Sequence, residues 1–390
     1  MSDTLIADPF ELSDTQKAIR DTVREFAAKE LAPKAAEIDE KGEFNRGIFA
    51  KMSEIGLLGI PVPEDLGGAG LDILSFIITL EEIAKVCGST CLGLAAHTSL
   101  GTMPIVDFGS KAQKETYVPP NARGERIGAY GLTEPGAGSD SGATATRAVQ
   151  VAGGWKITGS KLFMTNASVA GSMIITAVTD ADKPKHQRIS AFILDPSWKG
   201  ITVAKKEDKL GCRGSDTCYV TFEDVVVPEG NLLGERGQGF HYFMNILNGG
   251  RIGIGAMALG LAEGAYAKAA KYVTERRAFG KPIGGHQAVA FMIADMEVEI
   301  RAAKHMIYHA ARLKDAGRPY KLEASCAKLF ASEMAMRVCR NAIQCLGGYG
   351  YMSEYGVEVK MRDAKLCEIG EGTSEIQRIV ISREILGKLE

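Results

Sequence analysis

The spacing of apolar residues changes twice along this chain of 390 residues, and this change limits its fold more than any other feature. From residue 13 to about 125, apolar residues recur at three- and four-residue intervals, which predicts helices. From about 126 to 236 they recur at every second position, in short β-branched segments separated by Gly, Pro, Asp or Ser. From about 237 onward the helical spacing returns. The pattern therefore predicts helices, then a sheet, then helices again.

The three segments are each long enough for a domain, since a domain usually has about 100–200 residues. Ser13 has the position of an N-cap for the first helix. The alternation at Cys218, Val220 and Phe222 indicates an antiparallel sheet with one buried face, either a sandwich or a barrel. We expect a helical, a β and a second helical domain: 1–125, 126–236 and 237–390. The last is predicted to be a four-helix bundle, with these helices: 239–276, 284–316, 320–346 and 374–388.

The charge balance excludes some classes of partner. Lys and Arg total 46 against 48 Asp and Glu, so no broad basic surface is available for nucleic acid. No run approaches the roughly 20 apolar residues of a membrane span. The N-terminal stretch lacks the basic start and apolar core of a signal peptide, and the eight cysteines form no CxxC pair. We therefore expect a cytoplasmic protein with reduced cysteines.

Several common catalytic patterns are missing from the sequence. No strand–glycine–helix unit with GxGxxG spacing is found, which argues against a nicotinamide-binding domain. His305 and His309 have a metal-like spacing of four residues, but no third ligand accompanies them. We expect no metal site.

An acidic residue between two glycines raises a different possibility. In "EIGEGTSEIQR", residues 368–378, Glu371 stands between Gly370 and Gly372, just before a helix that Thr373 is suited to cap. Taken alone, the pattern describes a turn whose acid complements the helix dipole. Bare backbone on both sides would also let the carboxylate reach a ligand.

Five further stretches have unusual glycines, hydroxyls, cations or aromatics. Each has an ordinary explanation, such as a loop, a core aromatic, a helix C-cap or close helix packing. Together they offer hydroxyls, accessible N–H groups and arginines suited to a phosphate or a flat polar ring. They are "YGLTEPGAGSD" (130–140), "FMTN" (163–166), "NGGRIGIGAMALG" (248–260), "ERRAFGKPIGGHQ" (275–287) and "QCLGGYGY" (344–351).

Four of these stretches, all except "NGGRIGIGAMALG", are followed by "RDAKLCEIGEGTSEIQR" (362–378). In this order and spacing, the five resemble the acyl-CoA dehydrogenase family over essentially the whole chain, most closely its short- and branched-chain bacterial type. The resemblance implies FAD bound between the β domain and the C-terminal bundle. It implies an acyl-CoA substrate, a homotetramer built as a pair of dimers, and electron-transfer flavoprotein as the electron acceptor.

Matching positions imply roles for individual residues. Those expected along the flavin are Tyr130, Leu132, Thr133, Gly138, Ser139, Phe163, Thr165, Thr373 and Glu375. Those expected at the adenosine-diphosphate half of FAD, across the dimer interface, are Arg276, Phe279, Gln287, Gln344, Gly347 and Gly348. Those expected at the acyl-CoA are Ser139, Phe240, Asn248, Arg251 and Gly372, with Gly370 and His97 as candidates at the acyl end.

The resemblance also gives Glu371 a task, which is to remove a proton from the carbon beside the thioester carbonyl. Its backbone N–H and a flavin hydroxyl would stabilise the carbonyl oxygen, and the flavin would take a hydride from the next carbon. An apolar cavity should raise the pKa of Glu371 toward the working pH. Some relatives carry the base on the helix of the "NGGR" stretch, where this chain has Gly249 and Gly250 and no acid.

The chain departs from its relatives at several positions. Phe163 and Asn248 stand where Trp and Asp are common, and Gly370 stands where many relatives have an aromatic residue, which we expect to widen the acyl pocket. No Arg lies near His97, so a glutaryl-type substrate is not expected. Two alternatives stay open: an acyl-CoA oxidase on the same scaffold, and a catalytically silent flavoprotein scaffold.

Overall fold

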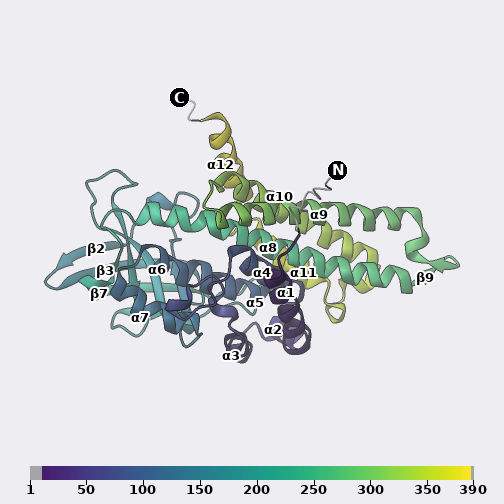
Figure 1. The fold of residues 1–390 in the computed structure, drawn as a ribbon, viewed down its shortest axis with the longest axis horizontal. Helices are drawn as coiled ribbons and strands as arrows, with labels where there is room; N and C mark the ends of the chain where they lie inside the picture. The colour runs from purple at the N-terminus through teal and green to yellow at the C-terminus, as the bar shows by residue number, and fades with distance from the viewer. Residues whose placement is uncertain (1–10, 388–390) are drawn as a thin grey trace, which may run out of the picture.

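The computed structural model describes residues 11–387, and its elements follow the predicted helix–sheet–helix order. Figure 1 shows an elongated molecule with the strands at one end and three long C-terminal helices along its length. The N-terminal stretch, for which we expect no signal peptide, lies mostly outside the described residues. Among residues 11–387, no helix is long and apolar enough to cross a membrane.

In the N-terminal part, α4 packs against α1 and α5, and most of its residues are apolar and buried. Ser13 caps the first helix as predicted: its hydroxyl accepts from the Gln16 N–H, and the Gln16 side chain accepts from the Ser13 N–H. The helices are α1 (Asp14–Phe26), α2 (Ala35–Lys41), α3 (Arg46–Glu54), α4 (Ile73–Val86), α5 (Gly88–Ala95), α6 (Met103–Phe108) and α7 (Lys111–Ala122).

The middle segment forms one eight-stranded sheet, ordered β6-β7-β3-β2-β4-β5-β8, with β1 paired to β4. Its strands are β1 (Ile127–Gly131), β2 (Arg147–Val151), β3 (Gly154–Thr165), β4 (Ala170–Val178), β5 (Ile189–Leu194), β6 (Ile201–Val203), β7 (Thr217–Pro228) and β8 (Leu232–Leu233). As predicted, Cys218, Val220 and Phe222 face the core.

Most strand pairs are antiparallel, as predicted, but two pairings in this sheet are parallel. β1 runs parallel to β4, and β2 meets β4 in parallel at one residue pair. The physical reason is connectivity. β1 enters directly from α7, and two further strands separate it from β4 along the chain, so no hairpin forces the two to run in opposite directions.

The C-terminal helices confirm the predicted ones to within a few residues: α8 (Gly239–Glu275), α9 (Gln287–Asp315), α10 (Lys321–Leu346) and α12 (Ser374–Leu386). Residue 388 of the last predicted helix lies outside the described residues. A further helix, α11 (Glu358–Cys367), was not predicted. Its buried face includes Lys360 and Asp363, so it shows little apolar periodicity. A two-stranded hairpin, β9 (Arg277–Ala278) and β10 (Lys281–Pro282), follows α8.

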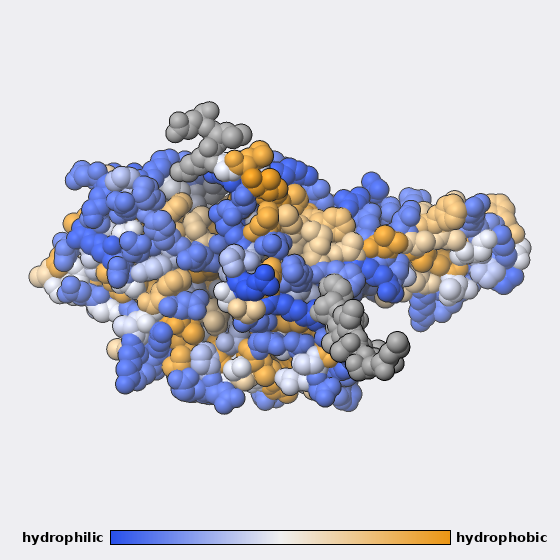
Figure 2. All heavy atoms as spheres, turned by 45° about the horizontal axis from the view of Figure 1, so that its top comes forward, coloured by the Kyte–Doolittle hydropathy of each residue, from blue (hydrophilic) through white to orange (hydrophobic). Residues whose placement is uncertain are grey.

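α12 projects from the bundle next to α10 (Figure 1). Apolar side chains gather on its outer surface close to the C-terminus (Figure 2), where Ile379, Ile385 and Leu386 are exposed. The cysteines are free thiols, and all except the half-buried Cys326 are buried, as expected for core residues.

Candidate active site

Glu371 lies in the turn between α11 and α12, in a backbone conformation that few side chains adopt. Its φ is 53°, and the φ of Gly372 is 95°. Left-handed residues other than glycine cost about 1–3 kcal/mol and concentrate at functional sites. Thr373 then caps α12 as predicted, with its hydroxyl accepting from the Ile376 N–H at 3.3 Å. The turn therefore aims Glu371 away from the helix that follows it.

The Glu371 carboxylate rests on α8 at Gly250. A Cβ on Gly250 would lie 1.8 Å from Glu371 Oε2, so only glycine leaves room for the carboxylate. Although the residue as a whole is half-buried, Oε2 is buried and has no hydrogen-bond partner within residues 11–387. Burial raises the pKa of Glu371 to about 7, against the opposing effects of Lys328 and Arg251. The predicted rise in pKa is confirmed.

Tyr130 extends the site to the β domain. Its ring stacks on Phe243 of α8 at 4.5 Å between centroids. Its hydroxyl is buried without a hydrogen-bond partner in the described part of the chain, and burial followed by the negative charge of Glu371 raises its pKa well above the usual value. Segments from the middle and C-terminal parts of the chain thus meet at Glu371.

The loop after Tyr130 is fastened by a buried ion pair that sequence reasoning missed. Lys161 of β3, which is fully buried, donates to Glu134 Oε1 at 2.7 Å and to the Leu132 carbonyl at 3.2 Å. The other Glu134 oxygen accepts from the Ala145 N–H at 2.7 Å. Lys161 lies within a predicted strand, at a position that faces the core. A charged residue at such a position was the only feature of the sequence that could have indicated a buried ion pair.

The end of this loop is open. Ser139 is exposed, and a Cβ on Gly138 would meet no atom within 4 Å. Nearby, Phe163 of β3 has a φ of 58° and is 60% exposed. The pairing of β3 with β7 shifts between Lys161 and Met164, which marks a bulge. Bulges beside active sites turn side chains outward, and this one presents the Phe163 ring. The half-buried Thr165 follows at the end of the strand.

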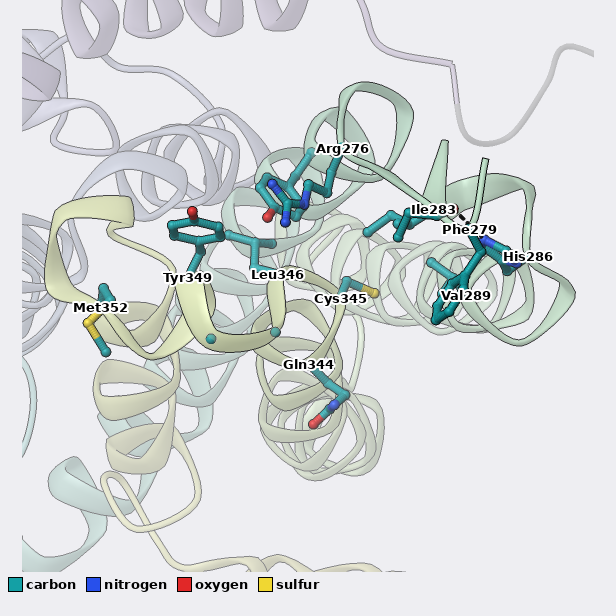
Figure 3. A pocket seen from close by; sticks show the side chains of 14 residues that line it. Arg276, Phe279, Ile283, His286, Val289, Gln344, Cys345, Leu346, Tyr349 and Met352 are labelled. Carbon is teal, nitrogen blue, oxygen red and sulfur yellow. Dashed lines mark hydrogen bonds between the residues drawn. The ribbon is translucent and has the colours of Figure 1, made fainter. Parts of the chain in front are cut away.

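A second hollow, of about 670 Å³, lies where α8 ends, beside β9. It brings together five predicted residues from two stretches far apart in sequence: Arg276, Phe279, Gln344, Gly347 and Gly348. Figure 3 shows Arg276 beside Tyr349, whose ring centroid is 5.7 Å from the guanidinium carbon. Gln287, the first residue of α9, is exposed and does not line the hollow.

Phe279 is unusually prominent in this second hollow. It is 94% exposed and has a φ of 51°. Its ring meets His286 edge-on, with 5.9 Å between centroids. An apolar ring this exposed on a strained backbone leaves most of its surface available for a flat ligand or another chain.

Two of the predicted substrate residues on α8, Asn248 and Arg251, form a polar cluster near Glu371. Arg251 is buried and donates from Nη1 to Asn248 Oδ1 at 2.8 Å and to Ser325 Oγ at 3.3 Å. Its Nε has no partner in the described part of the chain. Phe240, near the start of the same helix, is half-buried.

A small hollow of about 100 Å³ lies beside Gly250, between α4, α6 and α8, and its walls include Phe76, Met103 and Ile246. His97 does not line it. His97 is buried, and its Nδ1 accepts from the Gly128 N–H of β1 at 2.9 Å. Burial lowers the pKa of His97 to about 4, so it stays neutral.

The two remaining candidates flank the turn. A Cβ on Gly370 would make only ordinary contacts, with the Leu366 carbonyl at 3.5 Å, so this position has room for a side chain. Glu375, in the first turn of α12, is exposed, and hydrogen bonds to its own N–H and to Thr373 lower its pKa.

Known proteins resemble this chain in all three of its segments. Sequence profiles of the acyl-CoA dehydrogenase N-terminal, middle and C-terminal domains match residues 13–125, 129–225 and 237–386. A short-chain-specific acyl-CoA dehydrogenase of Clostridium acetobutylicum is 50% identical over 376 residues, covering 96% of this chain and 99% of the relative.

Two solved structures agree closely with the fold. Butyryl-CoA dehydrogenase of Megasphaera elsdenii has a TM-score of 0.95 and 42% identity, covering 97% of this chain and 99% of its own. A chain in the structure of the electron transferring flavoprotein of Acidaminococcus fermentans has a TM-score of 0.96 and 46% identity, covering 97% of this chain and 100% of its own. On this evidence the chain belongs to the acyl-CoA dehydrogenase family of FAD-dependent oxidoreductases.

Proposed function

We propose that this protein oxidises a short-chain acyl-CoA to the 2-enoyl-CoA, with Glu371 as the base that removes the α-proton. The observation that carries this proposal is the unpartnered Glu371 carboxylate on Gly250, with a pKa of about 7. A base with a pKa near the working pH combines a large deprotonated fraction with a strong tendency to take the proton. The small adjoining hollow and the short-chain-specific relative support a short acyl group.

Backbone geometry supports a second role for the turn. The Glu371 N–H makes no hydrogen bond to any residue in 11–387. It can therefore donate to the thioester oxygen as negative charge develops there, which is the usual way to stabilise such an intermediate.

The residues present fit a bound flavin. The outward Phe163 ring, the open backbone at Gly138 and the unpartnered Tyr130 hydroxyl form a surface suited to a flat polar ring. Bound FAD supplies the acceptor for the hydride that leaves the substrate β-carbon. The chain itself holds that ring, orients the thioester and moves the α-proton.

The positions of the two hollows support a dimer. α8 is 37 residues long, and Arg276 follows its last residue, whereas Glu371 rests at Gly250. At about 1.5 Å per residue, Gly250 and Arg276 lie about 39 Å apart along the helix, which exceeds the length of an extended FAD molecule. We propose that the Arg276 hollow of one chain holds the adenosine diphosphate of a flavin whose ring lies in a second chain.

Further assembly and electron transfer complete the proposal. The apolar outer face of α12 would be covered in a pair of such dimers, a homotetramer. The similarity to a chain in an electron transferring flavoprotein structure supports such a flavoprotein as the electron acceptor.

The test is the flavin absorbance of the purified protein, recorded anaerobically before and after adding straight, branched and cyclic acyl-CoA thioesters. Rapid bleaching by butyryl-CoA or a branched analogue is expected. A yellow protein that none of them bleaches would contradict the proposed reaction, and a colourless one would favour a silent scaffold. Reoxidation of the bleached protein by air as fast as by electron-transfer flavoprotein would favour the oxidase.

A further inference from the structure

A buried lysine lies under the catalytic turn. Lys328 of α10 is fully buried, and its Nζ donates to the Gly372 carbonyl at 2.7 Å. Gln377 of α12, also fully buried, donates from Nε2 to the same carbonyl at 2.9 Å and to the Glu371 carbonyl at 3.3 Å. Both carbonyls of the turn are thus held from the protein interior.

This anchoring explains how the strained turn persists. Consecutive left-handed residues are stable only when their surroundings fix them, and here three hydrogen bonds from two buried side chains do so. The Glu371 N–H has no hydrogen-bond partner among the described residues. The same anchoring keeps the Glu371 side chain over Gly250.

The positive charge of Lys328 also acts on the Glu371 carboxylate. Lys328 opposes the effect of burial on the pKa of Glu371, as Arg251 of α8 does. The other groups that face this pair are Tyr130 of β1, and Cys367 and Glu368 at the end of α11. Burial lowers the pKa of Lys328 itself to about 8, so between about pH 7 and pH 8 an ionised Glu371 faces a charged Lys328.

We propose that Lys328 is a positioning residue for the reaction: it holds the Gly372 carbonyl, and with it the left-handed Glu371 turn, and supplies a buried positive charge that favours the ionised base. This inference rests on the proposed role of Glu371 but adds a residue that touches neither substrate nor flavin in the proposed mechanism.

The chain offers a matched control. Lys360 of α11 is buried like Lys328 and also donates to backbone carbonyls, at Ala84 (3.2 Å) and Val86 (2.7 Å), but it does not contact the Glu371 turn. We would compare Lys328→Met, Lys328→Arg and Lys360→Met as FAD-loaded proteins. The measurements are the pH dependence of kcat with butyryl-CoA, the KM near neutral pH, and hydrogen exchange of the 368–377 peptide.

Lys328→Met should lower kcat about 10- to 100-fold with little change in KM, the effect of losing a hydrogen bond from a charged group. Its acidic limb should move to higher pH, because Glu371 loses a nearby positive charge. Lys328→Arg should restore the position of that limb, since Arg stays charged. Hydrogen exchange in 368–377 should quicken in Lys328→Met and stay slow in Lys360→Met.

Two results would overturn the proposal. One is an acidic limb at the same pH in Lys328→Met as in the wild type. The other is an equal loss of kcat and equal exchange in Lys360→Met, which would reduce Lys328 to a general contributor to stability. Bleaching of the wild-type flavin by butyryl-CoA tests the proposed function separately, so failure of one conclusion is distinguishable from failure of the other.

Discussion

Glu371 Oε2 lies 1.8 Å from the point at which a side chain on Gly250 would begin. The carboxylate therefore occupies the space that a side chain on α8 would otherwise fill. Gly250 has no side chain in this space, and the left-handed turn places the Glu371 carboxylate there. The relationship explains a helical glycine that costs about 1 kcal/mol relative to alanine.

Gly250→Ala should abolish activity without destabilising the fold. The new methyl group would displace the carboxylate, which can swing away at small cost, while the helix gains about 1 kcal/mol from its better propensity. We expect kcat/KM to fall at least about 100-fold, as for loss of a general base. Thermal unfolding and kcat/KM check this, with Gly255→Ala as the control, where the nearest atom to the new methyl lies at 3.3 Å. Equal activity in the two variants would contradict it.

Glu371→Gln should separate catalysis from stability. Activity should fall about 10²- to 10⁴-fold, because the base is gone. The wild-type pKa rises from 4.5 to about 7 on folding, so the folded state binds this proton more tightly and loses stability as pH rises from about 4.5 to about 7. Gln has no such loss, so the variant should unfold at a higher temperature than the wild type at pH 8 but not at pH 4. A lower unfolding temperature at pH 8 would be inconsistent with a desolvated carboxylate.

Lys161→Met should loosen the loop after Tyr130, which contains Glu134. It leaves the Glu134 carboxylate buried without its cation, and removing one partner of a buried pair costs about 3–5 kcal/mol. The free energy of unfolding measured in urea and the FAD content per chain should both decrease. The double variant with Glu134→Gln should regain part of the lost stability, because no unpaired charge remains. No recovery in the double variant would mean that packing of Lys161, rather than the ion pair, holds the loop.

Gly370→Tyr should alter substrate choice more than folding. The backbone there is compatible with a side chain, and a Cβ makes only ordinary contacts. We expect the ring to narrow the acyl pocket, so that kcat/KM drops more for branched and cyclic thioesters than for butyryl-CoA. Competition between the two classes of substrate measures this directly. Equal losses would show that Gly370 does not set the width of the pocket.

Phe279→Ala should weaken flavin retention or assembly while leaving the chain itself as stable as before. The ring is 94% exposed, so the folded monomer gains little from it. The FAD content per chain should decrease, and the elution volume in gel filtration should increase because the assembly is smaller. Phe291→Ala on α9, which removes another exposed ring outside the hollow, serves as the control. Full FAD content and an unchanged elution volume in Phe279→Ala would argue against the shared flavin site.

The order of helices and strands could be predicted from the sequence, because apolar spacing is a local property of the chain. It also marked Glu371 as a candidate, because an acid between two glycines is visible in the sequence, but the role proposed for Glu371 came from the resemblance to a family. It could not reveal α11, because this helix buries Lys360 and Asp363 rather than an apolar stripe.

The contacts that each candidate residue makes became visible only in the folded chain. Gly250 and Glu371, Lys161 and Glu134, and Lys328 and Gly372 are all distant in sequence, and nothing in their local patterns pairs them. The parallel direction of β1 also depends on tertiary packing, as do the charges of Lys328 and Arg251 that oppose the rise in the pKa of Glu371. Desolvation and charge pairing depend on which segments pack together, and that packing is settled by long-range burial rather than by spacing along the chain.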